Sequence, residues 1–260
     1  MCVSSPSPST PGFVAVARLV AEGATAVRPP EATLRWRSRA WYDALHHRIE
    51  VRTLDLKQGD GRAALDRLLA DADVLVTSHR PSALARLGLD PASLRARHPA
   101  LRGVAIVGDT REPDVAGHDL TYQADAGLVD DRLPATLVAD LAGAERAVSA
   151  VLLVLREPPG THRQVGLRDS LDVFRTPRVH QLTTPGGPFG GADPAYQVYR
   201  ARDGVVALAA LEPHFRARLY TALDLPLDTP LDDVMTTRSC DEWAAFARAH
   251  DVPLSVVPRS

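Results

Sequence analysis

Over the first 175 residues, short apolar clusters alternate between the period of a strand and the period of a helix. Compact apolar runs predict strands at 24–27, 51–56, 74–76 and 104–107. Apolar positions three and four residues apart predict helices between them, at 13–23, 61–70, 81–87 and 91–98. Strands that alternate with short helices are typical of a parallel sheet covered by helices.

The pattern changes after residue 118. Residues 120–126 predict a helix, and 139–155 predict a long one whose apolar character on all sides indicates burial in a core or an oligomer interface. Residues 176–195 are rich in glycine and proline and predict loops. Beyond them, a hairpin is expected around Asp203-Gly204, followed by helices at 212–223 and 240–250.

These elements predict an α/β fold with two domains. A large Rossmann-like parallel-sheet domain is expected over residues 1–175, and a small α+β domain over 176–260. The pattern of the first residues predicts a loop. The sheet is therefore expected to lack an opening strand, unless residues 2–5 are a remnant of one.

Composition narrows the class of protein. The 260 residues are 45% hydrophobic and 24% charged, with a net charge of −2, so no global field would recruit nucleic acid or an anionic membrane. Two cysteines, Cys2 and Cys240, argue against a disulfide framework or a zinc site. No run is long enough to span a membrane, and the start lacks the features of a signal peptide, which predicts a cytoplasmic protein.

Three ionisable side chains stand out from apolar surroundings. They are His118, which follows a glycine and precedes a helical run, Asp140 at the start of the long helix, and Glu212 after the hairpin. Titratable groups converging from distant parts of a chain suit proton-transfer chemistry. Structural roles are the alternative: Asp140 as an N-cap, Asp119 as a cap of the helix that follows it, and Glu212-Pro213 as a helix start.

Taken in order, these segments resemble the class III CoA-transferase family, in particular its α-methylacyl-CoA racemase branch, over about residues 13–257. The segments that carry the resemblance are 72–76, Arg80-Pro81 with 84–89, 116–127, 137–143, 196–215 and 237–257. The family implies a large α/β and a small domain, usually in an interlocked homodimer, with coenzyme A present as an acyl-CoA substrate and no metal.

The resemblance also implies two chemistries. In the transferases, an aspartate at the position of Asp140 attacks the thioester; in the racemases, residues matching His118, Glu212 and Asp140 move a proton at the neighbouring carbon. Glu212 would orient the His118 ring, and helix N–H groups beside Asp140 would stabilise the enolate. Arg80, Asp119 and Tyr122 are expected to contact the acyl-CoA. The other histidines considered are expected on the surface: His79, His98, His162, His180 and His214.

The chain departs from the family pattern at three places. Residues 44–48 read Ala-Leu-His-His-Arg, residues 108–113 replace a glycine-rich loop, and Ala144 stands where a second glycine is usual. These positions affect CoA binding and the loop over the active site. Three functions therefore stay open: an acyl-CoA racemase or epimerase, a CoA-transferase using Asp140, and a non-catalytic relative that binds acyl-CoA or a partner.

Overall fold

The computed structural model describes residues 2–4, 10–28 and 38–258, and it divides the chain into two compact units. The first unit is Met1–Arg175 and the second is Thr176–Ser260. Each unit has its own hydrophobic core.

A six-stranded parallel sheet forms the centre of the first unit, with the strand order β3-β2-β1-β4-β5-β6. This is the order of a doubly wound nucleotide-binding fold, in which the chain changes direction between β1 and β4. The α/β parallel-sheet prediction is thus confirmed. The strands are β1 Cys2–Ser4, β2 Ala26–Arg28, β3 Glu50–Val51, β4 Val74–Thr77, β5 Arg102–Val107 and β6 His162–Gly166.

Three strand predictions need correction. The opening strand is present, because Cys2–Ser4 pairs with both β2 and β4 at the middle of the sheet. The strand expected at 51–56 is reduced to the two residues of β3. The sequence pattern did not predict β6. This edge strand has the sequence HRQVG, and only its last two residues are buried.

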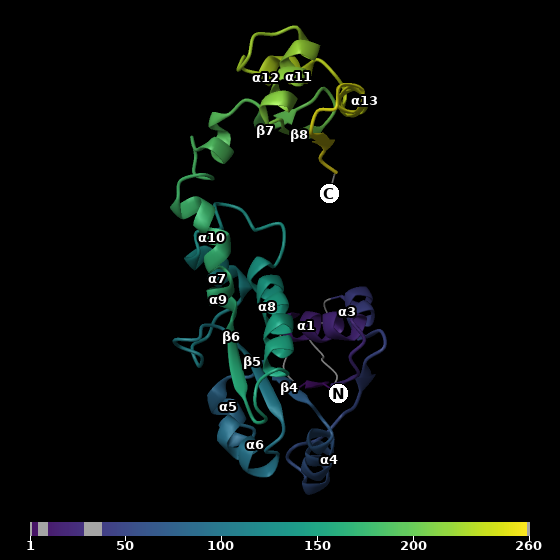
Figure 1. Ribbon diagram of the computed structural model, residues 1–260, viewed down its shortest axis with the longest axis vertical. Coiled ribbons are helices and arrows are strands. Elements are labelled where there is room, and N and C mark those ends of the chain that lie inside the picture. Colours follow the sequence, from purple (N-terminus) through teal and green to yellow (C-terminus); the bar gives the residue numbers. More distant parts are fainter. Residues whose placement is uncertain (1, 5–9, 29–37, 259–260) are drawn as a thin grey trace. The chain divides into compact units, whose positions relative to one another are not determined.

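Helices cover both faces of the sheet. On one face, α1 (Thr10–Ala21) lies beside α8 (Val138–Val154), and both pack on Val74 and Val76 (Figure 1). Leu75 points to the opposite face, since successive strand residues alternate, and there it meets α4 (Gly59–Ala70), α5 (Pro81–Arg86) and α6 (Pro91–Arg97). The remaining helices that begin in this unit are α3 Arg39–His46, α7 Asp119–Asp125, α9 Leu167–Ser170 and α10 Asp172–Val179.

The long helix α8 is buried along much of its length. A Cβ at Gly143 would collide with the side chain of Leu167, so this glycine permits the close approach of α8 to α9. Near the end of the helix, Leu152, Leu153 and Leu155 are exposed. One side of α8 is therefore buried in the core, as predicted, while the burial of these three leucines in an oligomer interface stays a prediction.

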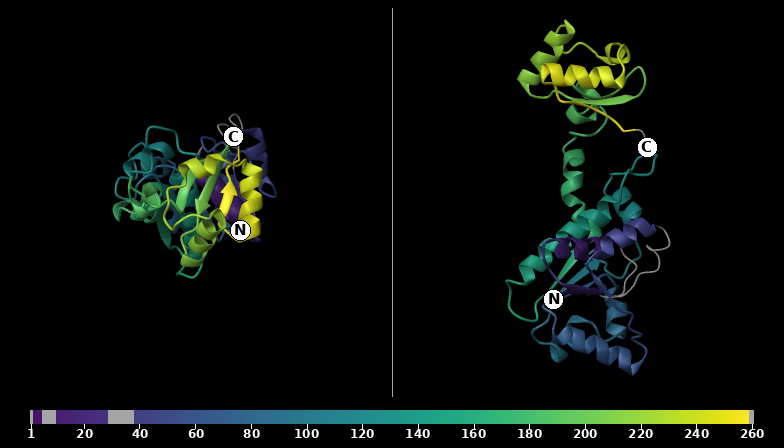
Figure 2. Two further views of the ribbon diagram at one scale, coloured as in Figure 1. Left: turned by 90° about the horizontal axis from the view of Figure 1, so that it is seen from above. Right: turned by 90° about the vertical axis from the view of Figure 1, so that its right-hand side faces the viewer.

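A three-stranded antiparallel sheet with helices makes up the second unit. The predicted hairpin is present as β7 (Tyr196–Arg200) and β8 (Val205–Ala209), and β9 (Leu254–Val256) adds to β8. The helix α13 (Cys240–His250) lies along this sheet (Figure 2). Residues 176–195 are not all loop, because α10 extends to Val179 and a short helical turn, η1, occupies Pro188–Ala192. Two more helices, α11 Pro213–Leu223 and α12 Asp232–Thr236, complete the unit.

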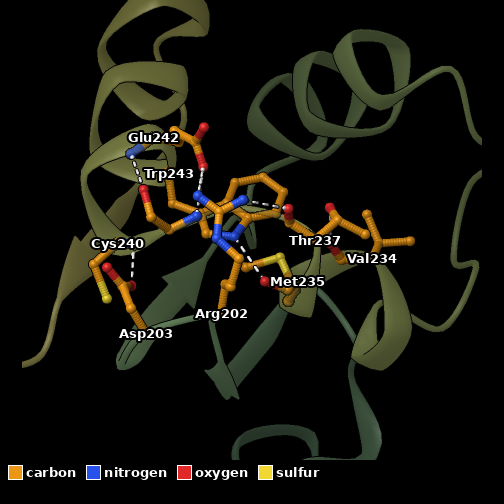
Figure 3. A network of polar contacts seen from close by, with 9 residues as sticks. Arg202, Asp203, Val234, Met235, Thr237, Cys240, Glu242 and Trp243 are labelled. Atoms are coloured by element: carbon orange, nitrogen blue, oxygen red, sulfur yellow. Dashed lines mark hydrogen bonds and ion pairs between the residues drawn. The ribbon is translucent and has the colours of Figure 1, made fainter.

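The turn between β7 and β8 is tied to the start of α13 by polar contacts (Figure 3). The Arg202 guanidinium donates to a Glu242 carboxylate oxygen at 2.8 Å and to the Thr237 carbonyl at 3.2 Å. The Asp203 carboxylate accepts the Cys240 N–H at 2.7 Å. These contacts hold the hairpin against the helix that carries the buried Trp243.

Candidate active site

A cavity of about 320 Å³ opens at the carboxyl ends of β4 and β5 in the first unit. Its wall includes Thr10, His79, Arg80, His118, Tyr122 and Asp140. In open α/β sheets, ligands bind outside the carboxyl ends of the strands, at the point where the strand order reverses. This cavity has that position, since α1 begins after β1, and β4 is the strand that pairs with β1 on its other side.

His118 lies at the N-cap position of α7, with its side chain exposed at the cavity. Its backbone is fixed by Thr121: the His118 N–H donates to the Thr121 hydroxyl at 3.0 Å, and that hydroxyl donates to the His118 carbonyl at 2.8 Å. The reciprocal pair holds the backbone at the helix start and leaves the imidazole accessible to a ligand.

Asp140 reaches the same cavity from the first turn of α8. It is the third residue of the helix, which begins at Val138, so its expected role as an N-cap is wrong. Burial, followed by the nearby charge of Asp119, raises the pKa of Asp140 to about 7, and a hydrogen bond with the Thr10 side chain acts in the opposite direction. This carboxyl group can therefore give up or take a proton near neutral pH.

Asp119 does not line the cavity. Only 6% of the residue is exposed; one carboxylate oxygen accepts the Asp140 N–H at 3.0 Å, and the other accepts the Gln123 side-chain amide at 2.5 Å. Asp119 is itself the first residue of α7, so the prediction that it caps the following helix is wrong. Its carboxylate serves α8 instead, and its predicted contact with acyl-CoA has no support in this geometry.

Two of the N–H groups expected to stabilise the enolate already have partners. The Asp140 N–H points to Asp119, and the Leu141 N–H donates within the helix to the Leu137 carbonyl at 3.0 Å. Neither N–H group is therefore available to a ligand without a rearrangement of the first turn of α8.

Tyr122 lines the cavity, and its hydroxyl group lies close to Gly108 and Gly117, which line it too. A Cβ at either Gly108 or Gly117 would collide with this oxygen, so the two glycines make room for the phenol. Burial, followed by the charges of Asp109 and Asp140, raises the pKa of Tyr122. The hydroxyl therefore remains protonated at neutral pH and can donate a hydrogen bond.

Two cationic or titratable groups come from the loop after β4. Arg80 is exposed at the N-cap of α5 and lines the cavity, where it can meet an anionic group. His79 also lines it, and burial lowers its pKa, so its prediction as a surface residue is wrong. His79 lies at the carboxyl end of a strand, directly before Arg80-Pro81, and this position could have predicted it as a residue of the site. His98 and His162 are also partly buried rather than on the surface.

Glu212 belongs to the second unit, where it is exposed at the N-cap of α11. The predicted helix start at Glu212-Pro213 is confirmed. Its pairing with His118 stays a prediction, because the two residues belong to different units.

Across the described ranges, no group of three or more histidine, cysteine, aspartate or glutamate side chains is arranged to hold a metal ion. Within the same part of the chain, no helix has the length and apolar character needed to cross a bilayer.

The sequence matches the model of CoA-transferase family III over residues 24–259. The chain belongs to CoA-transferase family III. The resemblance predicted from the sequence is thus confirmed at the level of the family. The fold agrees: a hypothetical protein from Mycobacterium tuberculosis superposes with a TM-score of 0.83 at 18% identity, over 100% of this chain and 84% of that one. A CAIB/BAIF family protein from Brucella suis gives a TM-score of 0.78 at 21% identity, over 100% and 83%.

Curated relatives in the family carry names of both chemistries. The human α-methylacyl-CoA racemase is 28% identical over 73% of this chain and 55% of its own length. The succinate–glutarate CoA-transferase of Agrobacterium fabrum is 30% identical over 66% of this chain and 48% of its own length. This family III chain thus spans about half the length of these two relatives.

Proposed function

We propose that this family III protein moves a proton on and off the α-carbon of a 2-methylacyl-CoA thioester, and so racemises or epimerises that carbon. The observation that carries the proposal is the shared cavity: His118 and Asp140 line it together, and the pKa of Asp140 is about 7. Inversion at one carbon needs a base and an acid at opposite faces, one without and one with a proton.

In the proposed reaction, the neutral imidazole of His118 takes the α-proton. The electron pair of the C–H bond moves into an enolate, whose negative charge rests on the former carbonyl oxygen. The protonated carboxyl of Asp140 then gives its proton to the opposite face of the carbon. The reverse reaction uses the same two groups with their roles exchanged, so no oxidant, reductant or metal is needed.

The enolate oxygen requires a hydrogen-bond donor. Because the Asp140 N–H is occupied by Asp119, we assign this role to the hydroxyl of Tyr122, a residue that lines the cavity. Oriented donors in a site that excludes water are the largest source of rate in many reactions of this kind.

The cavity fits one end of an acyl-CoA. Its volume of about 320 Å³ lies at the low end of the range for small-molecule sites, which suits the thioester and the acyl group and leaves the nucleotide part outside. Arg80, exposed at the cavity, is the side chain proposed to meet a phosphate of the coenzyme. Glu212 is proposed to orient the His118 ring, and the working protein is proposed to be a cytoplasmic homodimer.

Solvent isotope exchange tests the reaction. The full chain is incubated in D₂O with a single enantiomer of a 2-methylacyl-CoA, and deuterium at the α-carbon is followed by NMR. Incorporation together with loss of optical purity is expected. If calorimetry shows that the thioester binds but no deuterium enters, proton transfer is not the activity.

A CoA-transferase reaction is the second candidate, supported by the transferases among the relatives and by the accessibility of Asp140 in the cavity. It would leave an acyl or CoA group on Asp140, which mass spectrometry of a rapidly quenched mixture detects. The ionised carboxylate is the nucleophile in this reaction, and a group with a pKa of about 7 is partly ionised near neutral pH, so adduct formation should increase as the pH rises through 7. Absence of any CoA binding would instead favour a non-catalytic relative.

A further inference from the structure

Asp119 and Asp140 form a close pair of acidic residues of which only Asp140 opens into the cavity. Asp119 is 6% exposed, and its carboxylate accepts the Asp140 backbone N–H. Among the described residues, no lysine or arginine forms an ion pair with either side chain. Two neighbouring carboxyl groups without a cation do not readily ionise together, so the pair favours a state with one proton.

The hydrogen bonds decide which member keeps the proton. Both oxygens of Asp119 accept bonds from N–H donors, namely the Asp140 N–H and the Gln123 side-chain amide. A carboxyl group that accepts two N–H bonds is suited to the ionised form, because a protonated oxygen would face a donor. Asp140 has a hydrogen bond with the Thr10 side chain and is otherwise open to the cavity, so the proton belongs to Asp140.

The same carboxylate joins the two helices that form this part of the site. Asp119 begins α7 and bonds to the first turn of α8, so it fixes Asp140 relative to His118, which directly precedes Asp119. Gln123 extends the connection, because its side-chain amide also donates to the Thr136 carbonyl at 3.2 Å, just before α8. The first turn of α8 and the segment just before it are thus held by one network centred on Asp119 and Gln123.

We propose that Asp119 is a positioning residue of this site: its buried carboxylate fixes the first turn of α8 and, by its charge, controls the protonation state of Asp140. In the proposed reaction, which this inference presupposes, Asp119 never touches the substrate. Burial raises the pKa of Asp140 most, and the charge of Asp119 adds to it, so that Asp140 is the acid when His118 is the base.

Other charges around Asp140 come from each element at the cavity. The loop after β4 contributes His79 and Arg80, the residue before α7 contributes His118, and α7 contributes Tyr122. Arg80 is exposed, and burial lowers the pKa of His79, which favours its neutral form. Of the acidic groups named here, Asp119 is the buried one that bonds to the Asp140 backbone.

The test follows the carboxyl ¹³C signal of Asp140 against pH in the full chain, with the signal assigned by its disappearance in Asp140→Asn. Asp119→Asn removes the charge and keeps an oxygen that can accept the Asp140 N–H. Its titration midpoint is expected to fall by about one pH unit, a tenfold weaker proton affinity. Asp125→Asn is the matched control, because it removes an exposed carboxylate from the same helix, and it should leave the midpoint unchanged.

Asp119→Ser is a second neutral variant, and it is used if Asp119→Asn disturbs the packing around Gln123. Equal midpoints in wild type and the Asp119 variants, or an equal shift in Asp125→Asn, would overturn the proposal. If both Asp119 variants lose cooperative unfolding, the residue is only structural and the proposal is also overturned. The titration needs no turnover, so its result is independent of the isotope test. If the wild-type protein shows no isotope exchange, the proposed function is refuted. The effect of Asp119 on the protonation of Asp140 is still decided by the titration midpoints.

Discussion

Asp140 of the first unit has a very different environment from the acidic side chains that form ion pairs in the second unit. In the second unit, the Arg216 guanidinium pairs with both Asp193 and Asp228, and Arg202 pairs with Glu242. In the first unit, Asp140 lies beside another carboxylate, and its pKa rises to about 7. The Glu242 pKa moves the other way, lowered first by hydrogen bonding to the Ser239 backbone and then by the Ser239 side chain.

The difference separates charges that support the fold from charges that carry chemistry. Exposed carboxylates with a guanidinium or a helix N-terminus as partner cost the protein little and hold an element in place. A partly buried carboxyl beside a like charge costs folding free energy, and such a cost is concentrated at functional sites. The cavity of the first unit is therefore the region where activity is expected. The network in Figure 3 has a structural role, because it connects the β7–β8 turn to the start of α13.

The largest expected effect comes from His118→Ala. General acid–base catalysis contributes roughly 100- to 10,000-fold, so α-proton exchange should fall by at least about 100-fold. The melting temperature should stay unchanged, because the imidazole is exposed. His180→Ala, which removes another exposed histidine, is the control and should keep full exchange. Equal losses of melting temperature and exchange would make His118 a structural residue.

Asp140→Asn should stabilise the protein at high pH. The folded-state pKa of about 7 lies above the ordinary value of 3.8, so the fold loses stability as the pH rises from 3.8 to about 7, the range in which only the unfolded chain is ionised at this residue. Relative to wild type, the free energy of unfolding of the variant should increase by on the order of 2 kcal/mol between pH 5 and pH 8. Urea titrations at the two pH values measure this change, and a difference that does not vary with pH would contradict the assigned pKa.

Tyr122→Phe should slow exchange by about tenfold, the value of one hydrogen bond to a developing charge. Gly108→Ala should cause at least the same loss, because the new Cβ collides with the phenol oxygen. In the double variant the two losses should not add, since Tyr122→Phe removes the atom with which the Cβ collides. Additive losses in kcat would show that Gly108 acts independently of the Tyr122 hydroxyl.

The smallest effect is expected in the second unit. Ser239→Ala removes a side chain that accepts the Glu242 N–H at 3.2 Å, and it should cost about 1 kcal/mol of unfolding free energy without any change in exchange. The contribution of Glu242 is present above the ordinary carboxyl pKa and is lost as the pH falls, because its pKa is lowered in the fold. Ser149→Ala, an exposed serine within α8, is the control that should lose no cap.

Sequence patterns correctly predicted helices and strands that are long or that have a recognisable turn sequence. Asp203-Gly204 predicted the β7–β8 hairpin, and the apolar run at 139–155 predicted α8 nearly to its ends. They failed for β1 and β6, because three residues give no period and an edge strand with mostly polar residues lacks the signal of burial. Short strands of this kind are specified by their neighbours in the sheet.

For the site, the order of segments was enough to single out His118 and Asp140, which line one cavity. The part played by Asp119 was not predictable, because its partner Asp140 N–H lies 21 residues away in the chain and is brought near by helix packing. The raised pKa of Asp140 has the same origin, since burial and the charge of Asp119 arise only in the folded unit.

The contrast between the two units depends most on the proton of Asp140. Its carboxyl ¹³C shift, followed in the wild-type chain from pH 3 to pH 9, tests this claim without substrate, partner or turnover. The account predicts a midpoint of about 7, because Asp140 is partly buried beside Asp119. A midpoint near the ordinary value of 3.8 would mean that Asp140 is a fully ionised carboxylate at neutral pH, and it would contradict the assignment of Asp140 as the acid.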